Sequence, residues 1–291
     1  MNSSSRASAR EVVKVFGSTR HEKEDWLALE EPLEIQVAHG PASARVVETV
    51  AVTMRTPGHD RELAAGFLLG EGLIRDFAQI ESVHTAGPRF GPGRWTNSVR
   101  VAFRPEAQFN LSRLERNFYM TSSCGVCGKT SVEMLEVNLP PLDPPSALRF
   151  DPALICDLPN RLRHAQAVFE RTGGLHAVGL FTAHGDPICV REDVGRHNAM
   201  DKVIGAQFLA GHPIPADAIV VVSGRASFEL MQKALAAHIS VFVSVGAPSS
   251  LAADLAQRSG ATLIGFVKPD GFNIYTGAER IAAHAPEIAS L

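Results

Sequence analysis

The chain has 291 residues, of which 45% are hydrophobic and 20% charged, as is typical of a soluble globular protein with one large or two modest domains. A formal net charge of −3 provides no broad basic surface and argues against nucleic acid as a partner. No apolar run is long enough to cross a bilayer, and the first ten residues lack the apolar core of a secretory signal. We therefore expect a cytoplasmic protein without a membrane partner.

The first half of the chain predicts short strands around one helix. Alternating or β-branched residues predict strands over 33–37, 46–54 and 97–103. A Thr-Pro-Gly break follows the second strand, and Asp60 shortly after it is a suitable cap for the helix expected next. This half is therefore expected to be strand-rich, with α+β character.

The second half changes to strands that alternate with helices. Continuous apolar strands separated by amphipathic helices predict a layered α/β sheet covered on both faces. We expect strands over residues 177–182, 188–190, 218–223, 239–244 and 262–266, and helices over 198–210, 228–238 and 250–259.

These patterns divide the chain into four parts. Residues 1–11 are expected to form a disordered tail, 12–118 an N-terminal α+β domain and 151–291 a C-terminal α/β domain. Residues 119–150 hold a Cys-x-x-Cys loop followed by a proline-rich connector, which cannot form regular helix or central strand. We expect the Cys-x-x-Cys loop to be mobile, because glycines and small residues dominate it.

The most informative motif is the pair Cys124 and Cys127 within Ser-Ser-Cys-Gly-Val-Cys-Gly-Lys. Small neighbours leave the sulfur atoms accessible, and Lys129 favours thiolate over thiol. Four cysteines in all are too few for a disulfide framework at this length, which fits a reducing compartment. The pair is therefore expected to carry chemistry.

Three kinds of chemistry can use such a pair. A structural zinc site needs a second close pair of ligands, but Cys156 and Cys189 lie far apart in the sequence. Thioredoxin-like redox proteins carry their pair early in a small domain, whereas this pair lies in mid-chain. Sulfur carriage needs one accessible, low-pKa thiolate on a flexible loop and suits the pair best, while dithiol redox chemistry stays open.

Polar loops follow the strands of the second half. Because strands hold the loops at their ends rigidly, we expect these loops to form one rim that binds a polar, anionic ligand. Arg191, Arg196 and Arg225 are candidate phosphate ligands, and the carboxylate of Asp193 suits a guanine edge. Capped helix starts with exposed arginines explain each loop equally well when it is taken alone. The four loops span residues 191–198, 223–227, 246–250 and 268–273.

Several sequence blocks together resemble the FdhD family, and the resemblance extends from about Val12 to Tyr275. The blocks share their order along the chain and their residue types with that family. They are Thr56-Pro-Gly58, Gly66-Phe-Leu-Leu-Gly-Glu-Gly72, the Cys124 motif, Thr172-Gly-Gly-Leu-His-Ala177, Arg191-Glu-Asp-Val-Gly-Arg-His-Asn-Ala-Met-Asp-Lys202, Ser223-Gly-Arg-Ala-Ser-Phe-Glu229, Leu263-Ile-Gly-Phe266 and Asn273-Ile-Tyr275.

This resemblance implies a sulfur carrier required for formate dehydrogenase activity. A cysteine desulfurase is expected to load sulfur on Cys124 as a persulfide, with Cys127 assisting. The sulfur is then delivered to the molybdenum or tungsten of a bis-pyranopterin guanine dinucleotide cofactor, which is cargo and not a resident group. The family also implies a homodimer. The implied cofactor-binding segment comprises Phe266, Val267, Lys268, Pro269, Asp270 and Gly271.

The resemblance further implies that the C-terminal domain has a cytidine deaminase-like fold. Deaminase chemistry needs a Pro-Cys-x-x-Cys motif and a His-x-Glu motif at a zinc ion. Ser123 precedes Cys124, and Ala199 stands two positions after His197, so neither motif is present. We expect no deamination and no permanently bound metal. A cofactor-binding chaperone of formate dehydrogenase that transfers no sulfur is the competing class of function.

Overall fold

The computed structural model describes residues 6–90, 95–107, 142 and 148–283. The Cys124 and Cys127 motif, with most of the segment predicted over 119–150, lies outside these residues. Among the described helices, none is long and apolar enough to cross a membrane.

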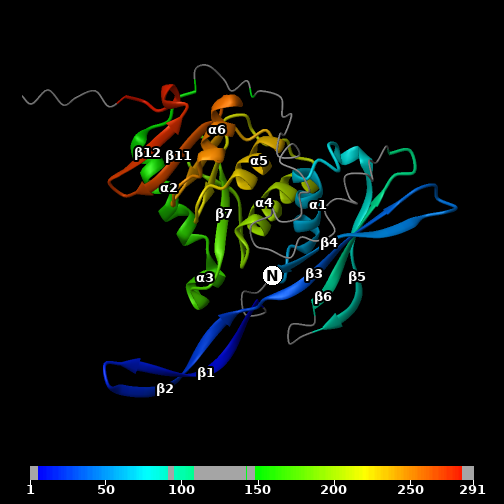
Figure 1. Cartoon of the computed structure of the whole chain (residues 1–291), viewed down its shortest axis with the longest axis horizontal. Helices are drawn as coiled ribbons and strands as arrows, with labels where there is room; N and C mark the ends of the chain where they lie inside the picture. Colours follow the sequence, from blue (N-terminus) through cyan, green and yellow to red (C-terminus); the bar gives the residue numbers. More distant parts are fainter. Residues whose placement is uncertain (1–5, 91–94, 108–141, 143–147, 284–291) are drawn as a thin grey trace, which may run out of the picture.

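The described chain begins with a β-hairpin that extends from the body of the molecule (Figure 1). Its strands β1 (Ala7–Phe16) and β2 (Thr19–Ala28) pair antiparallel along their whole length. The prediction of a disordered tail to residue 11 is therefore wrong from Ala7 onward. The hairpin was missed because β2 is dominated by charged residues and lacks the apolar alternation that indicates a half-buried strand.

A four-stranded sheet follows, in the order β4-β3-β6-β5. The predicted strands and helix of this half are confirmed, and β5 is an addition. Helix α1 covers one face of the sheet, where Leu63 and Leu68 pack with Ile35 and Val101. The elements are β3 (Glu31–His39), β4 (Val46–Arg55), α1 (Asp60–Gly70), the 3-10 turn η2 (Phe77–Gln79), β5 (Ile80–Phe90) and β6 (Trp95–Phe103).

The second half contains a six-stranded sheet in the order β12-β11-β10-β9-β7-β8. Strands β9, β10 and β11 pair in parallel. Strand β7 is antiparallel to both of its neighbours, β9 and β8, so β8 runs in the same direction as β9. Strand β12 is antiparallel to β11. The elements are α2 (Pro152–His164), α3 (Ala167–Thr172), β7 (His176–Phe181), β8 (Pro187–Asp193), α4 (Arg196–Ala210), β9 (Ile219–Val222), α5 (Phe228–Ala236), β10 (Val241–Ser244), α6 (Ser250–Arg258), β11 (Thr262–Lys268), β12 (Gly271–Thr276) and η5 (Ala278–Arg280).

Helices cover both faces of this sheet, as the apolar strands predicted. On one face Val220 and Phe242 pack in a core with residues of α4, α5 and α6. On the other face Val221 and Val243 pack with Leu158 of α2. The mixed α/β architecture is confirmed, while the likeness to cytidine deaminases stays a prediction.

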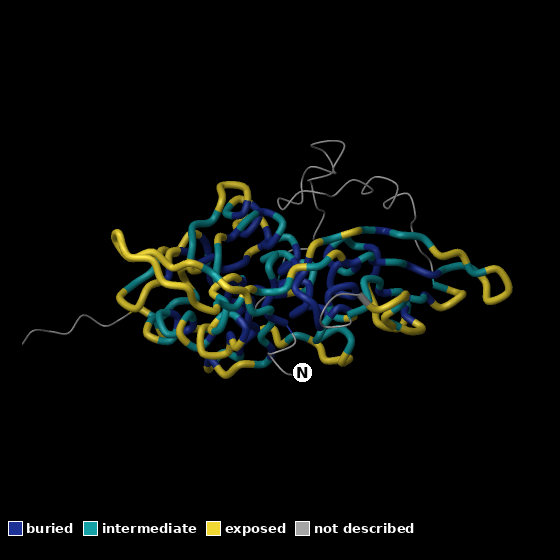
Figure 2. The backbone as a smooth tube through the Cα atoms, turned by 90° about the horizontal axis from the view of Figure 1, so that it is seen from below, coloured by how far each residue is buried: buried dark blue, intermediate teal, exposed yellow. Residues whose placement is uncertain are grey.

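The two halves meet where α1 crosses α4, and buried backbone continues through the middle of the molecule (Figure 2). Two glycines make the crossing possible. A Cβ atom on Gly66 would lie 1.9 Å from the carbonyl oxygen of Asp201, and one on Gly205 would lie 1.8 Å from that of Glu62. The two helix backbones are therefore in direct contact, which no side chain larger than hydrogen permits.

Substitution of Gly205 by alanine is expected to destabilise the protein. The added methyl group has to push the backbone of α1 away, so Gly205→Ala should lower the free energy of unfolding by about 1–3 kcal/mol or more, despite the better helix propensity of alanine. Urea denaturation measures this change. Gly271→Ala is the control, because a Cβ there meets no atom within 4 Å. Equal stability of the two variants would contradict the tight crossing.

Candidate functional site

The predicted rim exists at the edge of the six-stranded sheet where the parallel strands end. Backbone contacts join its loops from one strand to the next. The Ala177 N–H donates to Ser223 Oγ at 2.9 Å, the Gly246 N–H to the Gly224 carbonyl at 2.9 Å, and the Phe266 N–H to the Gly246 carbonyl at 3.1 Å. Loops that are distant in sequence therefore form one continuous surface, which we call the rim.

Three helices also begin at this edge. Ser227 caps α5 by accepting a hydrogen bond from Leu230 N–H, and Ser249 caps α6 by accepting one from Ala252 N–H. Helix α4 begins after Gly195, which has no side chain to cap it. The N-terminal ends of all three helices carry partial positive charge, so the rim favours a negatively charged ligand.

A cavity of about 590 Å³ opens at the rim, a size suited to a small-molecule ligand. Its walls come from the ends of β7, β9 and β10, from the residue after β8, and from α2 and α3. Representative lining residues are Arg163, Gln166, Phe169, His176, Val194, Ser223 and Val245. We call this space the rim cavity.

Arg191, a predicted phosphate ligand, pairs instead with a carboxylate of the other half. Its Nε and Nη2 atoms donate to the two oxygens of Glu62 at 2.6 and 2.9 Å, a bidentate pair. His59 Nδ1 lies 3.2 Å from the same carboxylate. Burial raises the pKa of Glu62, but the bond from His59 and the Arg191 guanidinium outweigh burial and lower this pKa to about 2. In this structure Arg191 thus holds the two halves together.

Asp193 is fully buried, and its carboxylate has four protein donors. It accepts hydrogen bonds from Lys202 Nζ at 2.6 Å, Gly195 N–H at 2.9 Å, Asn198 Nδ2 at 3.1 Å and Thr56 N–H at 3.1 Å. Thr56 belongs to the N-terminal half and the other donors to the C-terminal half. The carboxylate therefore closes the joint between the halves, and its contact with a guanine edge stays a prediction.

Arg196 and Arg225 are the predicted cations that this structure leaves available at the rim. Arg196 is half-buried, and its Nε has no hydrogen-bond partner among the described residues. Arg225 is exposed and lies against Gly246, where a Cβ would be 3.1 Å from its Cγ. Among the described residues neither guanidinium group forms an ion pair, so both can bind an anion without first losing one.

Phe266 is the prominent residue of the predicted cofactor-binding segment. Its φ angle of 54° lies in the left-handed region, which costs about 1–2 kcal/mol for a residue with a side chain. Despite this cost the residue is 44% exposed at the rim, and strained backbone of this kind is often found at ligand sites. Val267 is buried in the core, so its side chain cannot reach a ligand. Lys268, Pro269 and Asp270 are exposed, and Gly271 is half-buried.

Two histidines at the rim were not predicted as site residues. His176 lines the rim cavity, and burial lowers its pKa, assisted by nearby Arg196. His197 Nε2 lies 3.3 Å from Ser227 Oγ and 3.9 Å from a carboxylate oxygen of Glu229. Burial, with help from nearby cations, lowers the pKa of His197 to about 3, so its ring is neutral near pH 7. Both residues stand in sequence blocks already recognised, but only their packing shows that they face the rim.

The two described cysteines differ from a reactive pair. Burial raises the pKa of the Cys156 thiol and also that of the Cys189 thiol. Both groups are therefore protonated near pH 7 and are poor nucleophiles. The motif cysteines Cys124 and Cys127 lie outside the described residues.

Comparison with known proteins places the chain among close relatives. The model of the FdhD/NarQ family matches residues 28–282. The protein named sulfur carrier protein FdhD in Streptomyces avermitilis is 44% identical over 278 residues, which cover 95% of this chain and 96% of that protein. The protein of the same name in Mycobacterium tuberculosis is 46% identical, over 88% of this chain and 92% of its own.

A solved structure is similar over nearly the whole chain. It is a protein from Desulfotalea psychrophila described as a candidate formate dehydrogenase accessory protein. The TM-score is 0.71 at 25% sequence identity, and the match covers 95% of this chain and all of the other.

The low pKa of His197 predicts a specific pH dependence. Between pH 6.5 and about 3 the unfolded chain binds a proton at this residue and the folded chain does not, so stability falls as the pH is lowered. The slope from this group approaches about 1.4 kcal/mol per pH unit. His197→Gln should therefore lose less stability than the wild type between pH 6 and 4 in urea denaturation. The exposed His184, replaced by Gln, is the control, and parallel curves for all three proteins would contradict the assignment.

Proposed function

Because the chain belongs to the FdhD/NarQ family, we propose that it is a sulfur carrier for the maturation of formate dehydrogenase. In this proposal a cysteine desulfurase supplies the sulfur and Cys124 carries it as a persulfide. The acceptor is the molybdenum or tungsten of the bis-pyranopterin guanine dinucleotide cofactor, before the cofactor enters the dehydrogenase. The protein acts in the cytoplasm as a homodimer, without nucleic acid or membrane partners.

Loading and release both follow thiol exchange chemistry. The Cys124 thiolate attacks the terminal sulfur of the desulfurase persulfide; a new S–S bond forms, the old one breaks, and the desulfurase leaves as a thiolate. For release, the Cys127 thiolate attacks the Cys124 sulfur, so that HS⁻ departs to the metal and a Cys124–Cys127 disulfide remains. Oxidation of the two cysteine sulfurs to this disulfide supplies the two electrons that reduce the sulfane sulfur to HS⁻. A dithiol reductant then restores both thiols.

The rim is a surface of suitable length and charge for the cofactor, and its geometry supports the proposal most directly. Five adjacent strand ends, from β11 to β8, span about 19 Å at the usual strand spacing. This length suits an extended dinucleotide better than a lone phosphate. Phe266 at one end can stack on guanine, while Arg225 and Arg196 are available for the phosphates. The N-terminal ends of α4, α5 and α6 add favourable charge along the same line.

The persulfide step can be tested by mass spectrometry. Incubation with a cysteine desulfurase and free cysteine should add one sulfur atom to Cys124, because its thiolate is the nucleophile. Cys156→Ala and Cys189→Ala should load normally, since burial keeps these thiols protonated. The Cys124→Ala variant should not load. A wild-type protein without any adduct would rule out carriage on this residue.

Activation of apo-formate dehydrogenase then separates the carrier from a cofactor-binding chaperone. Cys124→Ala should abolish activation, and Cys127→Ala should slow it by impairing release. If the double variant Cys124→Ala, Cys127→Ala activates the dehydrogenase as well as the wild type does, the protein is a chaperone that transfers no sulfur.

The rim predicts where guanine nucleotide binds. Replacement of Arg196 or Arg225 by alanine should each raise the Kd for GDP about tenfold, since each removes a charge-assisted hydrogen bond. Phe266→Ala should weaken binding to a similar degree through lost stacking. Arg258→Ala is the matched control, because this exposed arginine lies at the opposite end of α6. Calorimetry measures the Kd, and unchanged affinity in both rim arginine variants would show that GDP binds elsewhere.

A further inference from the structure

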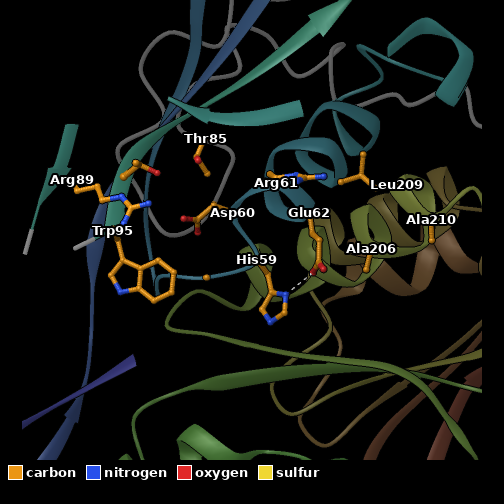
Figure 3. Close-up of a pocket in the computed structure, with 12 residues that line it drawn as sticks. His59, Asp60, Arg61, Glu62, Thr85, Arg89, Trp95, Ala206, Leu209 and Ala210 are labelled. Carbon is orange, nitrogen blue, oxygen red and sulfur yellow. Dashed lines mark ion pairs between the residues drawn. The ribbon is translucent and has the colours of Figure 1, made fainter. Parts of the chain in front are cut away.

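A second cavity, of about 610 Å³, lies where the start of α1 and the end of α4 meet strands β5 and β6 (Figure 3). Trp95 and Arg89 come from the strands, His59 and Arg61 from the start of α1, and Leu209 from α4. None of the described residues that line it also lines the rim cavity. We call this space the tryptophan cavity.

The acidic residues of this cavity already have cationic partners. Asp60 accepts two hydrogen bonds from the buried Arg55, at 3.0 and 3.1 Å. Glu62 is paired with Arg191 and His59, as described above. Within the described part of the chain, Arg61 and Arg89 form no ion pair. The uncompensated charge of the lining is therefore positive.

A third guanidinium lies against the wall of the cavity. Arg6 is only 8% exposed, and its Nε has no hydrogen-bond partner among the described residues. A Cβ on the lining residue Gly58 would come within 2.9 Å of this group, so the guanidinium touches the wall. The carboxylates of Glu192, Asp60 and Glu62 already act on the charge of Arg6, but the buried Nε donor lacks an acceptor within the described part of the chain, which is costly and which an anionic ligand would offset. Its place beside the cavity is a second indication of an anionic ligand.

The remaining lining is apolar and partly aromatic. Trp95 is half-buried, and Figure 3 shows its indole beside Arg89 and across the cavity from α4, which contributes Ala206, Leu209 and Ala210. An indole face with an adjacent guanidinium suits a planar ring that carries an anionic group. The volume lies within the range of small-molecule sites, whereas a peptide would need an extended groove.

We propose that the tryptophan cavity is a second ligand site, which binds an anionic aromatic molecule of mononucleotide size. Its ring packs on Trp95, and Arg89 and Arg61 bind its phosphate or carboxylate. The site is separate from the rim, so a test of this proposal does not depend on whether the protein carries sulfur.

The chain provides its own reporter for this site. Trp26 and Trp95 are the two tryptophans. Trp26 belongs to the hairpin, where its ring stacks with Arg171 at 4.0 Å. In the Trp26→Phe variant, fluorescence therefore reports on Trp95 alone. Titration with AMP, GMP, benzoate and inorganic phosphate should give saturable quenching by the aromatic anions, and at least tenfold weaker binding of phosphate.

Substitutions in this background test the two arginines. Arg89→Ala and Arg61→Ala should each raise the Kd of the best aromatic anion about tenfold. Arg75→Ala, an exposed arginine outside the cavity, should leave it unchanged. Arg225→Ala at the rim should also leave the Trp95 signal unchanged while it weakens GDP binding measured by calorimetry.

Three results would overturn the proposal. They are absence of saturable quenching up to millimolar ligand, loss of the signal in the rim variant, and phosphate binding as tight as that of the nucleotides. A measurement without the Trp26 substitution guards against misfolding: calorimetry on wild type and Trp95→Ala, with folding checked by circular dichroism. The Trp95→Ala protein should lose one set of sites for AMP, and an unchanged isotherm counts against the site.

Discussion

The buried carboxylate of Asp193 is the interaction on which the arrangement of both halves depends. It meets Lys202 in a fully buried ion pair, and a backbone N–H of the N-terminal half completes its set of donors. Burial lowers the pKa of Lys202, and the Asp193 carboxylate opposes that shift. An ion pair of this kind adds little net stability over apolar packing, but removal of one partner leaves a buried charge and is strongly destabilising. Its effect is therefore to specify one docking geometry.

The same joint positions the rim. Asp193 is the last residue of β8, and its second oxygen accepts from Gly195 and Asn198, which fixes the start of α4. Arg196 and His197 follow directly in the sequence, so a fully buried carboxylate sets their position at the rim. Lys233 adds a further link, since it bonds Asp201 at 2.7 Å and lies 3.7 Å from Glu71 at the end of α1. The polar residues predicted as ligand contacts thus form two groups. Arg191 and Asp193 connect the two halves, whereas Arg196 and Arg225 lie at the rim.

The sequence predicted the alternating core of the fold well because burial dictates it. Apolar strands such as β9 and β10, and the helices between them, follow directly from periodicity. The sequence did not predict the β1–β2 hairpin, because both of its strands carry charged residues. It did not predict α2 either, because Pro159 lies inside that helix. The loop patterns predicted Arg196 and Arg225 as rim residues, and the family resemblance added Phe266. The sequence could not separate them from Arg191 and Asp193, because their partners Glu62 and Thr56 lie more than a hundred residues away in the chain.

Glu62 stands between the two cavities. Its side chain lines the tryptophan cavity, and its carboxylate forms an ion pair with Arg191. Arg191 precedes Val194, which lines the rim cavity, by three residues in the sequence. A ligand that altered this ion pair from one side would change the free energy of binding on the other. By thermodynamic reciprocity the second ligand would then affect the first by the same factor. Under the two proposals above, the Glu62–Arg191 pair would let a ligand of the tryptophan cavity adjust the affinity of the rim for its cargo.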